Sequence, residues 1–181
     1  MLCLVRGGLD GLRLRLLVGR GLRFLVVGTV PLDLLLTEAI AEGALDGLTA
    51  AEFAAVVSMF TFEPRRAEPE EVRLVGVVAD RYSRIEAAWK VVTGIEARRR
   101  VPATRTPEPG FAPQAYGWVA GADLEEIFGD DNFAAGDFVR NCRQLLDLMR
   151  QIRDAFPSLA AVAGPAISAT DRGIVATGGR A

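Results

Sequence analysis

The chain comprises 181 residues with a mass of 19.4 kDa, a length that suits one domain burying about 70% of its unfolded surface. Half of the residues are hydrophobic and a quarter are charged, a composition that excludes wholesale disorder. There is no histidine, and this excludes histidine-based catalytic triads and most catalytic zinc sites. The chain contains a single lysine, Lys90. No glycine-rich loop ends in Lys-Ser or Lys-Thr, so the chain alone is not expected to hydrolyse ATP or to hold a cofactor.

The first thirty residues differ in charge from the rest of the chain. Residues 1–30 carry five arginines and one aspartate, net +4, whereas residues 31–181 carry 16 basic and 22 acidic residues, net −6. Repeated glycines interrupt any regular period in residues 1–30, which fit either a short strand at Phe24 to Val27 or a poorly ordered, non-native leader. The arginines of residues 1–30 are spread through the segment and no small-residue cleavage pattern follows, which argues against a signal peptide.

Two cysteines, Cys3 and Cys142, are too few for a disulfide framework or a cysteine metal site. They predict a protein of a reducing compartment, the cytoplasm. Charges within every long apolar stretch predict no membrane span and no membrane partner. Cys142 is expected to be a small buried apolar residue.

The first predicted helix runs from Leu32 to Glu42, where apolar residues recur at i, i+3, i+4, i+7 and i+8. Gly43 follows at the position of a left-handed C-terminal cap. A second helix is expected to begin after Thr49, because Thr49 and Glu52 have the Thr-x-x-Glu spacing of a capping box. This helix is expected to end near Glu63, since a proline follows, and its apolar face carries Phe53, Val56, Val57 and Phe60.

A third predicted helix, of more than twenty residues, starts at the acidic segment Glu68 to Glu71 and extends past Val92. Prolines at 102, 107, 109 and 113 then mark an extended connection on the surface. Short helices are expected at Ala115 to Ala120 and from Asp123 to Gly129.

The clearest apolar stripe lies on a predicted helix from Ala134 to Phe156. At about 100° per residue, a single arc about 80° wide contains Phe138, Cys142, Leu145, Met149, Ile152 and Phe156. An alanine-rich helix is expected at Ser158 to Arg172, with Gly164-Pro165 as the place where it would split. Because helix follows helix without a βαβ alternation, the predicted fold class is all-α, with residues 31–181 forming a helical bundle that carries a long proline-bearing loop.

The face opposite the apolar stripe is basic. It carries Arg140, Arg143, Arg150 and Arg153. Guanidinium groups in a row suit nucleic-acid phosphates, because each makes bidentate contacts and releases counterions on binding. The competing interpretation is a solvated face with the i, i+4 pairs Arg143–Asp147 and Arg150–Asp154, each worth roughly 0.2–0.5 kcal/mol.

Two further groups are candidates for nucleic-acid contacts. A second basic cluster, predicted to follow the third helix within the proline-bearing loop, consists of Arg98, Arg99, Arg100 and Arg105, and it suits either a phosphate backbone or a solubilising linker. Tyr116 and Trp118 have rings that can stack on bases, although a Tyr-x-Trp pair in a short helix favours core packing, with one ring facing fully inward. The carboxylates at 125, 126, 130 and 131 fit a helix cap and a turn, since no catalytic or metal-ligand pattern accompanies them.

Three segments of the sequence share a pattern with a known family. They are LDGLTAAEFAAVVS at 45–58, FAPQAYGWVAG at 111–121 and AGDFVRNCRQLLDLMRQIR at 135–153. In this order they resemble the DSHCT domain, the C-terminal helical domain of superkiller-type DExH-box helicases, and especially its bacterial HelY-like branch. The likeness runs from about Leu32 to Ala176.

The resemblance implies a helical module that packs on a helicase core and lines the path of a translocating RNA or DNA strand. It favours Arg140 and Arg143 as strand contacts, with Arg150, Arg99, Arg100 and Trp118 as further candidates, and it assigns no catalytic residue. The family's Walker loop and DExH box are not in this sequence. The resemblance therefore implies a truncated or split helicase in which ATP and magnesium act only through a separate core. The alternative is a helical protein-interaction scaffold that does not bind nucleic acid.

Overall fold

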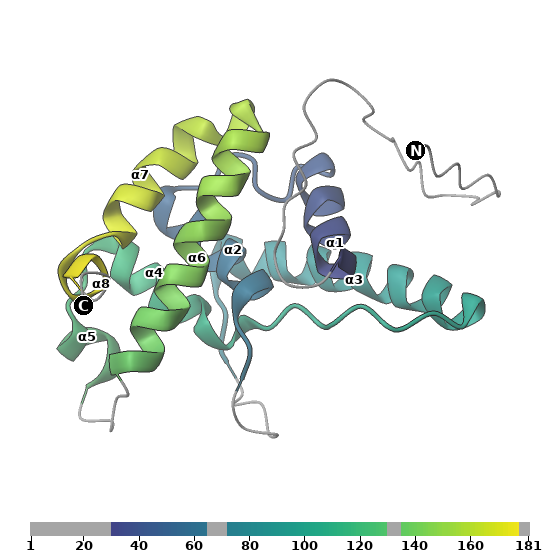
Figure 1. The fold of residues 1–181 in the computed structure, drawn as a ribbon, viewed down its shortest axis with the longest axis horizontal. Helices are drawn as coiled ribbons and strands as arrows, with labels where there is room; N and C mark the ends of the chain where they lie inside the picture. Colours follow the sequence, from purple (N-terminus) through teal and green to yellow (C-terminus); the bar gives the residue numbers. More distant parts are fainter. Residues whose placement is uncertain (1–29, 65–71, 130–134, 178–181) are drawn as a thin grey trace.

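The computed structural model describes residues 30–64, 72–129 and 135–177. Within these ranges the chain forms helices and no strand, which confirms the predicted all-α class. Figure 1 shows their arrangement. The α-helices are α1 (Val30–Ala41), α2 (Ala50–Thr61), α3 (Gly76–Arg99), α4 (Ala112–Ala120), α5 (Leu124–Phe128), α6 (Ala135–Ala155), α7 (Ala160–Thr170) and α8 (Gly173–Thr177). The leader predicted at residues 1–30, with its alternative strand, lies outside the described residues except for Val30, which begins α1.

Helix α2 forms the centre of the core and contacts α3, α4, α6 and α7. Its start is the predicted capping box: the backbone N–H of Thr49 donates to Glu52 Oε2 at 2.8 Å and the N–H of Glu52 donates to Thr49 Oγ1 at 3.4 Å. The sequence predicts one apolar face, but every residue from Phe53 to Thr61 is buried. A helix that is apolar on all sides can be enclosed completely, and the buried hydroxyl of Ser58 is satisfied by the carbonyl of Ala55 at 2.8 Å.

Helix α3 begins later than predicted. The prediction placed its first turn at Glu68 to Glu71, a segment that lies outside the described residues. Residues 72–75 are non-helical, and the helix begins at Gly76. Gly76 has φ +59°, a left-handed conformation that Gly adopts without the steric cost borne by other residues. The helix also extends to Arg99, so two of the arginines predicted to follow it belong to its last turn.

The C-terminal half of α3 extends beyond the other helices, and residues 101–108 return beside it (Figure 1). The returning segment is the proline-bearing loop expected from the sequence. It is held to the helix by three hydrogen bonds of buried Thr104. Its carbonyl accepts from Trp89 Nε1 at 2.8 Å, and its backbone N–H and hydroxyl donate to the Glu96 carboxylate at 2.8 and 2.5 Å. We call α3 from Glu86 onward, together with residues 100–108, the arm.

An aromatic cluster anchors α6 to the rest of the bundle. The ring of Phe138 makes edge contacts with Phe111, Trp118 and Phe128, at centroid distances of 5.8, 5.2 and 5.5 Å. These geometries are the edge-to-face arrangements that aromatic rings favour. The predicted stripe on α6 is confirmed, since its residues from Phe138 to Ile152 are buried and Phe156, just beyond the helix, is half-buried. Helix α7 continues through Pro165 without the predicted split.

Candidate nucleic-acid interface

An open groove of about 680 Å³ lies between the outer face of α6 and α8. Helix α6 contributes polar side chains to its wall, namely Arg140, Arg143, Gln144 and Asp147. Helix α8 contributes Ile174 and Thr177 from the opposite side. The groove therefore combines two cations and the carboxylate of Asp147 with an apolar lining, and it occupies the face of α6 that the sequence predicts to be basic.

The two arginines in the groove lack partners among the described residues. Arg140 is exposed and forms no hydrogen bond or ion pair with any residue in these ranges. Arg143 is half-buried, and its Nη2 atom is enclosed by the protein without a hydrogen-bond partner. A buried donor without an acceptor is costly, so the geometry at Arg143 favours an anion or a water as its missing partner. Arg140 and Arg143 lie about 4.5 Å apart along the helix axis, within reach of one phosphate.

The two ion pairs predicted along α6 are not the ones that form. The expectation was Arg143–Asp147 and Arg150–Asp154, both at i, i+4. Instead, Arg150 contacts Asp147 at 3.5 Å, and Arg153 contacts its neighbour Asp154 at 2.9 Å. The reason is tertiary: a carboxylate from outside the helix, Asp171, draws Arg150 toward the junction of α7 and α8, at 3.3 Å.

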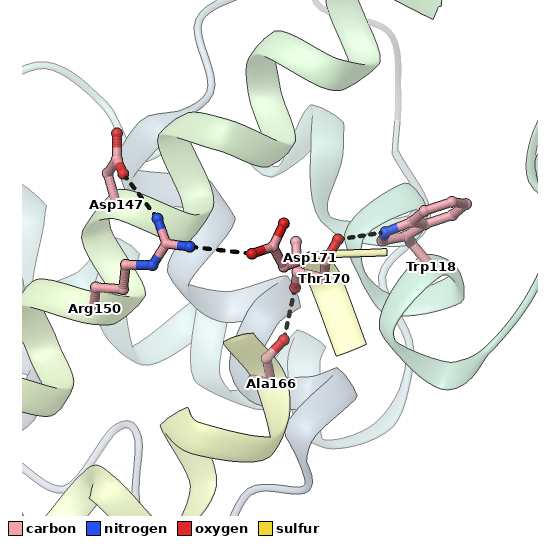
Figure 2. A network of polar contacts seen from close by, with 6 residues as sticks. All are labelled: Trp118, Asp147, Arg150, Ala166, Thr170 and Asp171. Atoms are coloured by element: carbon pink, nitrogen blue, oxygen red, sulfur yellow. Dashed lines mark hydrogen bonds and ion pairs between the residues drawn. The ribbon is translucent and has the colours of Figure 1, made fainter. Parts of the chain in front are cut away.

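Arg150 is therefore a different kind of candidate from Arg140 and Arg143. It lies on the same face of α6, about 20° from Arg143 and about 10.5 Å further along the axis. Both of its terminal nitrogens already face carboxylates, those of Asp147 and Asp171 (Figure 2). The four arginines of the basic face thus divide into two unpaired ones in the groove, Arg140 and Arg143, and two paired ones beyond it, Arg150 and Arg153.

Trp118 is a core residue in this structure, with 3% of its surface exposed. Its indole Nε1 donates to the carbonyl of Thr170 at 2.9 Å, Phe138 packs edge-on against the ring, and the guanidinium of Arg172 covers one face. The ring has no face open to a base, so the stacking role does not fit this geometry. The core interpretation of the Tyr-x-Trp pair does fit, because Tyr116 points outward and is 43% exposed.

The junction of α7 and α8 contains residues that the sequence analysis did not single out. Arg172 Nη2 donates to the carbonyls of Trp118 at 2.7 Å and Ala122 at 2.5 Å, which satisfies acceptors at the end of α4. Gly173 follows with φ +52°, and a side chain there would lie 3.4 Å from the Trp118 ring. The Asp171-Arg172-Gly173 tripeptide is a turn signal between two helical patterns, but nothing in it indicates which elements it would join.

The second basic cluster is split by the fold. Arg98, Arg99 and Arg100 are all exposed at the tip of the arm, and Arg100 ends α3 in the left-handed conformation at φ +57°. Arg105 instead donates to the carbonyls of Phe62 at 2.7 Å and Phe60 at 3.0 Å. Arg105 therefore caps the C-terminus of α2, while Figure 1 shows the arm tip on the far side of the bundle from α6.

Three further features of the described residues bear on metal binding, thiol reactivity and membrane insertion. They contain no group of three acidic, histidine or cysteine side chains arranged to hold a metal ion. Burial raises the pKa of the Cys142 thiol to about 12, so this cysteine stays protonated at neutral pH and is a poor nucleophile. Among the helices of the described ranges, none is long and apolar enough to cross a membrane.

Comparison with known proteins places these features in a family. The model of the DSHCT (NUC185) domain matches residues 29–177. The chain is 37% identical over 162 residues to "Probable helicase HelY" of Mycobacterium leprae and 35% identical over 158 residues to the protein of that name in Mycobacterium tuberculosis strain H37Rv. Each alignment covers 80% of this chain and 17% of the relative.

A more distant similarity extends to an animal protein. The chain is 27% identical over 132 residues to "mRNA transport homolog 4" of Caenorhabditis elegans, an alignment that covers 71% of this chain and 13% of that protein. The chain thus spans less than a fifth of the length of the curated relatives it matches.

Proposed function

Because the chain belongs to the DSHCT (NUC185) domain family, we propose that it serves as an accessory module of a superkiller-type helicase, holding one RNA or DNA strand in the groove between α6 and α8. In this proposal the module also packs against a helicase core, and ATP and magnesium act on that core. The observation that carries the proposal is the pair of unpartnered arginines, Arg140 and Arg143, in an open groove on the predicted basic face.

The charge of the surrounding surface limits how tightly the module alone can bind. Residues 31–181 carry a net charge of −6, so a polyanion is attracted only locally, by the groove and by the arm tip. Each phosphate contact contributes a slope of about −0.7 to log K against log salt for a single strand. We therefore expect weak binding with a small negative slope, carried mainly by Arg140 and Arg143.

The test is a titration of fluorescein-labelled single-stranded RNA with the full chain at low salt. Arg140→Glu is expected to weaken binding about tenfold, because it replaces a phosphate contact with a repelling charge. Arg153→Glu is the matched control: it makes the same charge change on the same helix, at a residue that already pairs with Asp154. Equal affinity of Arg140→Glu and the wild type would remove the groove from the proposal.

The arm tip is a second, independent part of the proposed strand path. Arg99 and Arg100 are exposed there and have no ion-pair partner among the described residues. The double variant Arg99→Gln, Arg100→Gln is expected to weaken RNA binding less than Arg140→Glu does, because no groove surrounds these side chains. Loss of all binding in this variant alone would move the main contact from the groove to the arm.

One observation favours the alternative, a protein-interaction scaffold. Several large apolar side chains are exposed on or beside α3, namely Val75, Val77, Val91 and Val101, and exposed apolar groups that gather in a patch mark protein contacts. A scaffold of this kind is expected to self-associate when isolated, and Val91→Asp is expected to reduce that association. Sedimentation velocity distinguishes the two functions, since a monodisperse monomer that binds RNA through Arg140 would exclude the scaffold.

A further inference from the structure

Arg150 lies between two carboxylates that come from different parts of the chain. Its Nη1 atom is 3.5 Å from Asp147 Oδ1, one turn earlier on α6, and its Nη2 atom is 3.3 Å from Asp171 Oδ2, at the junction of α7 and α8 (Figure 2). The three charges sum to −1. Both distances exceed the about 2.8 Å of a strong charge-assisted hydrogen bond, and the Arg150 side chain is 43% exposed. The Arg150 guanidinium is therefore partly exposed to solvent but engaged by a carboxylate at each of its terminal nitrogens.

Asp171 is the fixed member of this cluster, because its neighbours on both sides are tied to the core. The carbonyl of Thr170 accepts from the Trp118 indole at 2.9 Å. Arg172 caps the end of α4 and stacks on the Trp118 ring at 3.7 Å. The backbone N–H of Asp171 itself donates to the carbonyl of Ile167 at 3.0 Å. The carboxylate is thus presented to α6 from a rigid turn.

A strand that follows α6 beyond the groove would reach Arg150 next. Arg150 continues the line of Arg143 two helical turns further on, and Asp147, which lines the groove, lies between them. A phosphate at Arg150 would also sit beside two carboxylates, which repel it. The cation that the sequence offers at this position is therefore neutralised by the fold.

We infer that Asp171 is a positioning residue that withholds Arg150 from the strand and so confines strand contact to Arg140 and Arg143. This inference rests on the proposed function and deepens it, because it sets how many phosphates the module grips. A small number of phosphate contacts suits a strand that has to slide along the module, since each added contact tightens binding and steepens its salt dependence. Removing the Asp171 charge would turn Arg150 into an additional contact.

The experiment measures RNA affinity and its salt dependence for the full chain and for Asp171→Asn, Arg150→Gln and the double variant. Asp171→Asn is expected to bind about fivefold more tightly than the wild type, with the salt slope steeper by about 0.7. Arg150→Gln is expected to change wild-type affinity less than twofold, but to lower the affinity of Asp171→Asn about fivefold. The salt slope counts phosphate contacts, which loss of a purely structural ion pair would not increase.

A matched control separates the effect of releasing Arg150 from the effect of removing a negative charge in general. Glu42→Gln removes one negative charge from an exposed residue just beyond α1 that forms no ion pair with any described residue, so it frees no arginine and leaves the Arg150 cluster intact. It is expected to leave the salt slope unchanged. Thermal unfolding of every variant confirms that the fold is retained.

The outcomes distinguish this inference from the proposed function. Loss of affinity in Arg140→Glu, with Asp171→Asn indistinguishable from wild type, would overturn the role of Asp171 and leave the groove in place. An equal effect of Arg150→Gln with and without Asp171 would also overturn it. Absence of binding by both the wild type and Asp171→Asn would overturn the two proposals together.

Discussion

The guanidinium carbon of Arg172 lies 3.7 Å from the centre of the Trp118 ring, and the same guanidinium donates to the backbone carbonyl of Trp118. One side chain thus covers an aromatic face and caps the helix that carries it. The contact joins the start of α8 to the end of α4, across more than fifty residues of sequence. Because α8 is also one wall of the groove, this pair sets where that wall stands.

Replacing Arg172 with alanine is expected to lower the free energy of unfolding by about 2 kcal/mol. The change removes a partly desolvated cation–π contact, leaves the Ala122 carbonyl without its donor and leaves the Trp118 carbonyl with only the Gly121 N–H. Arg172→Lys is expected to recover less than half of the loss, because an ammonium does not reproduce the planar fork. Urea denaturation measures the free energy of unfolding of both variants. Arg153→Ala is the control: it breaks an exposed ion pair on α6 and is expected to stay within about 0.5 kcal/mol of wild type.

Two glycine-to-alanine substitutions are expected to change the stability of the protein in opposite directions. Gly173 has φ +52° and faces the Trp118 ring at 3.4 Å, so alanine there is strained and is expected to cost about 1–2 kcal/mol. Gly94 lies inside α3 with open space around it, so alanine there is expected to stabilise the protein by about 0.5–1 kcal/mol. Thermal unfolding checks the pair, and destabilisation by both changes would contradict the assignment of strain to Gly173.

The capping box of α2 is expected to make stability depend on pH in the acid range. Hydrogen bonds from Thr49, the backbone one foremost, hold the pKa of the Glu52 carboxyl below its ordinary value. A carboxyl whose folded pKa is depressed stabilises the fold above its unfolded pKa, and this contribution is lost as the pH falls through the folded pKa. The stability difference between wild type and Glu52→Gln is therefore expected to shrink between pH 7 and pH 3. A difference that stays constant over this range would contradict the assignment.

Cys142 is expected to resist alkylation in the folded protein. Its thiol is fully buried, and burial raises its pKa to about 12. Since the thiolate is the reactive form and an ordinary cysteine has a pKa of about 8.5, alkylation at pH 8 is expected to slow on the order of a thousandfold. Iodoacetamide labelling followed by mass spectrometry of the Cys142 peptide measures this, with labelling in urea as the reference. Rapid labelling of the native protein would show that α6 opens locally.

The arginines near the proline-bearing loop are expected to differ in their effect on stability. Arg105→Ala removes two donors from the C-terminal carbonyls of α2 and is expected to cost about 1–2 kcal/mol. Arg98→Ala changes an exposed residue at the arm tip and is expected to fall within about 0.5 kcal/mol of wild type. Equal effects in urea denaturation would show that Arg105 does not cap α2.

Much of the secondary structure follows from local sequence signals. The Thr49–Glu52 capping box, the end of α2 before Pro64 and the stripe on α6 were each predicted and are each present. Such features depend on residues within one or two helical turns, where spacing fixes which side chains can meet. The start of α3 was predicted wrongly: residues 72–75, which follow the acidic signal at 68–71, are non-helical, and α3 begins at Gly76.

For the candidate site, too, some features follow from the local sequence and others only from tertiary contacts. The sequence determined that one face of α6 is basic, because a helical period of 3.6 residues places Arg140, Arg143 and Arg150 together. Only the tertiary structure decided which of these cations stay unpaired, since Asp171 reaches Arg150 from 21 residues away in the chain. The same holds for Trp118, whose burial is set by Thr170 and Arg172. Periodicity assigns a residue to a face, but its partners come from segments that only folding brings together.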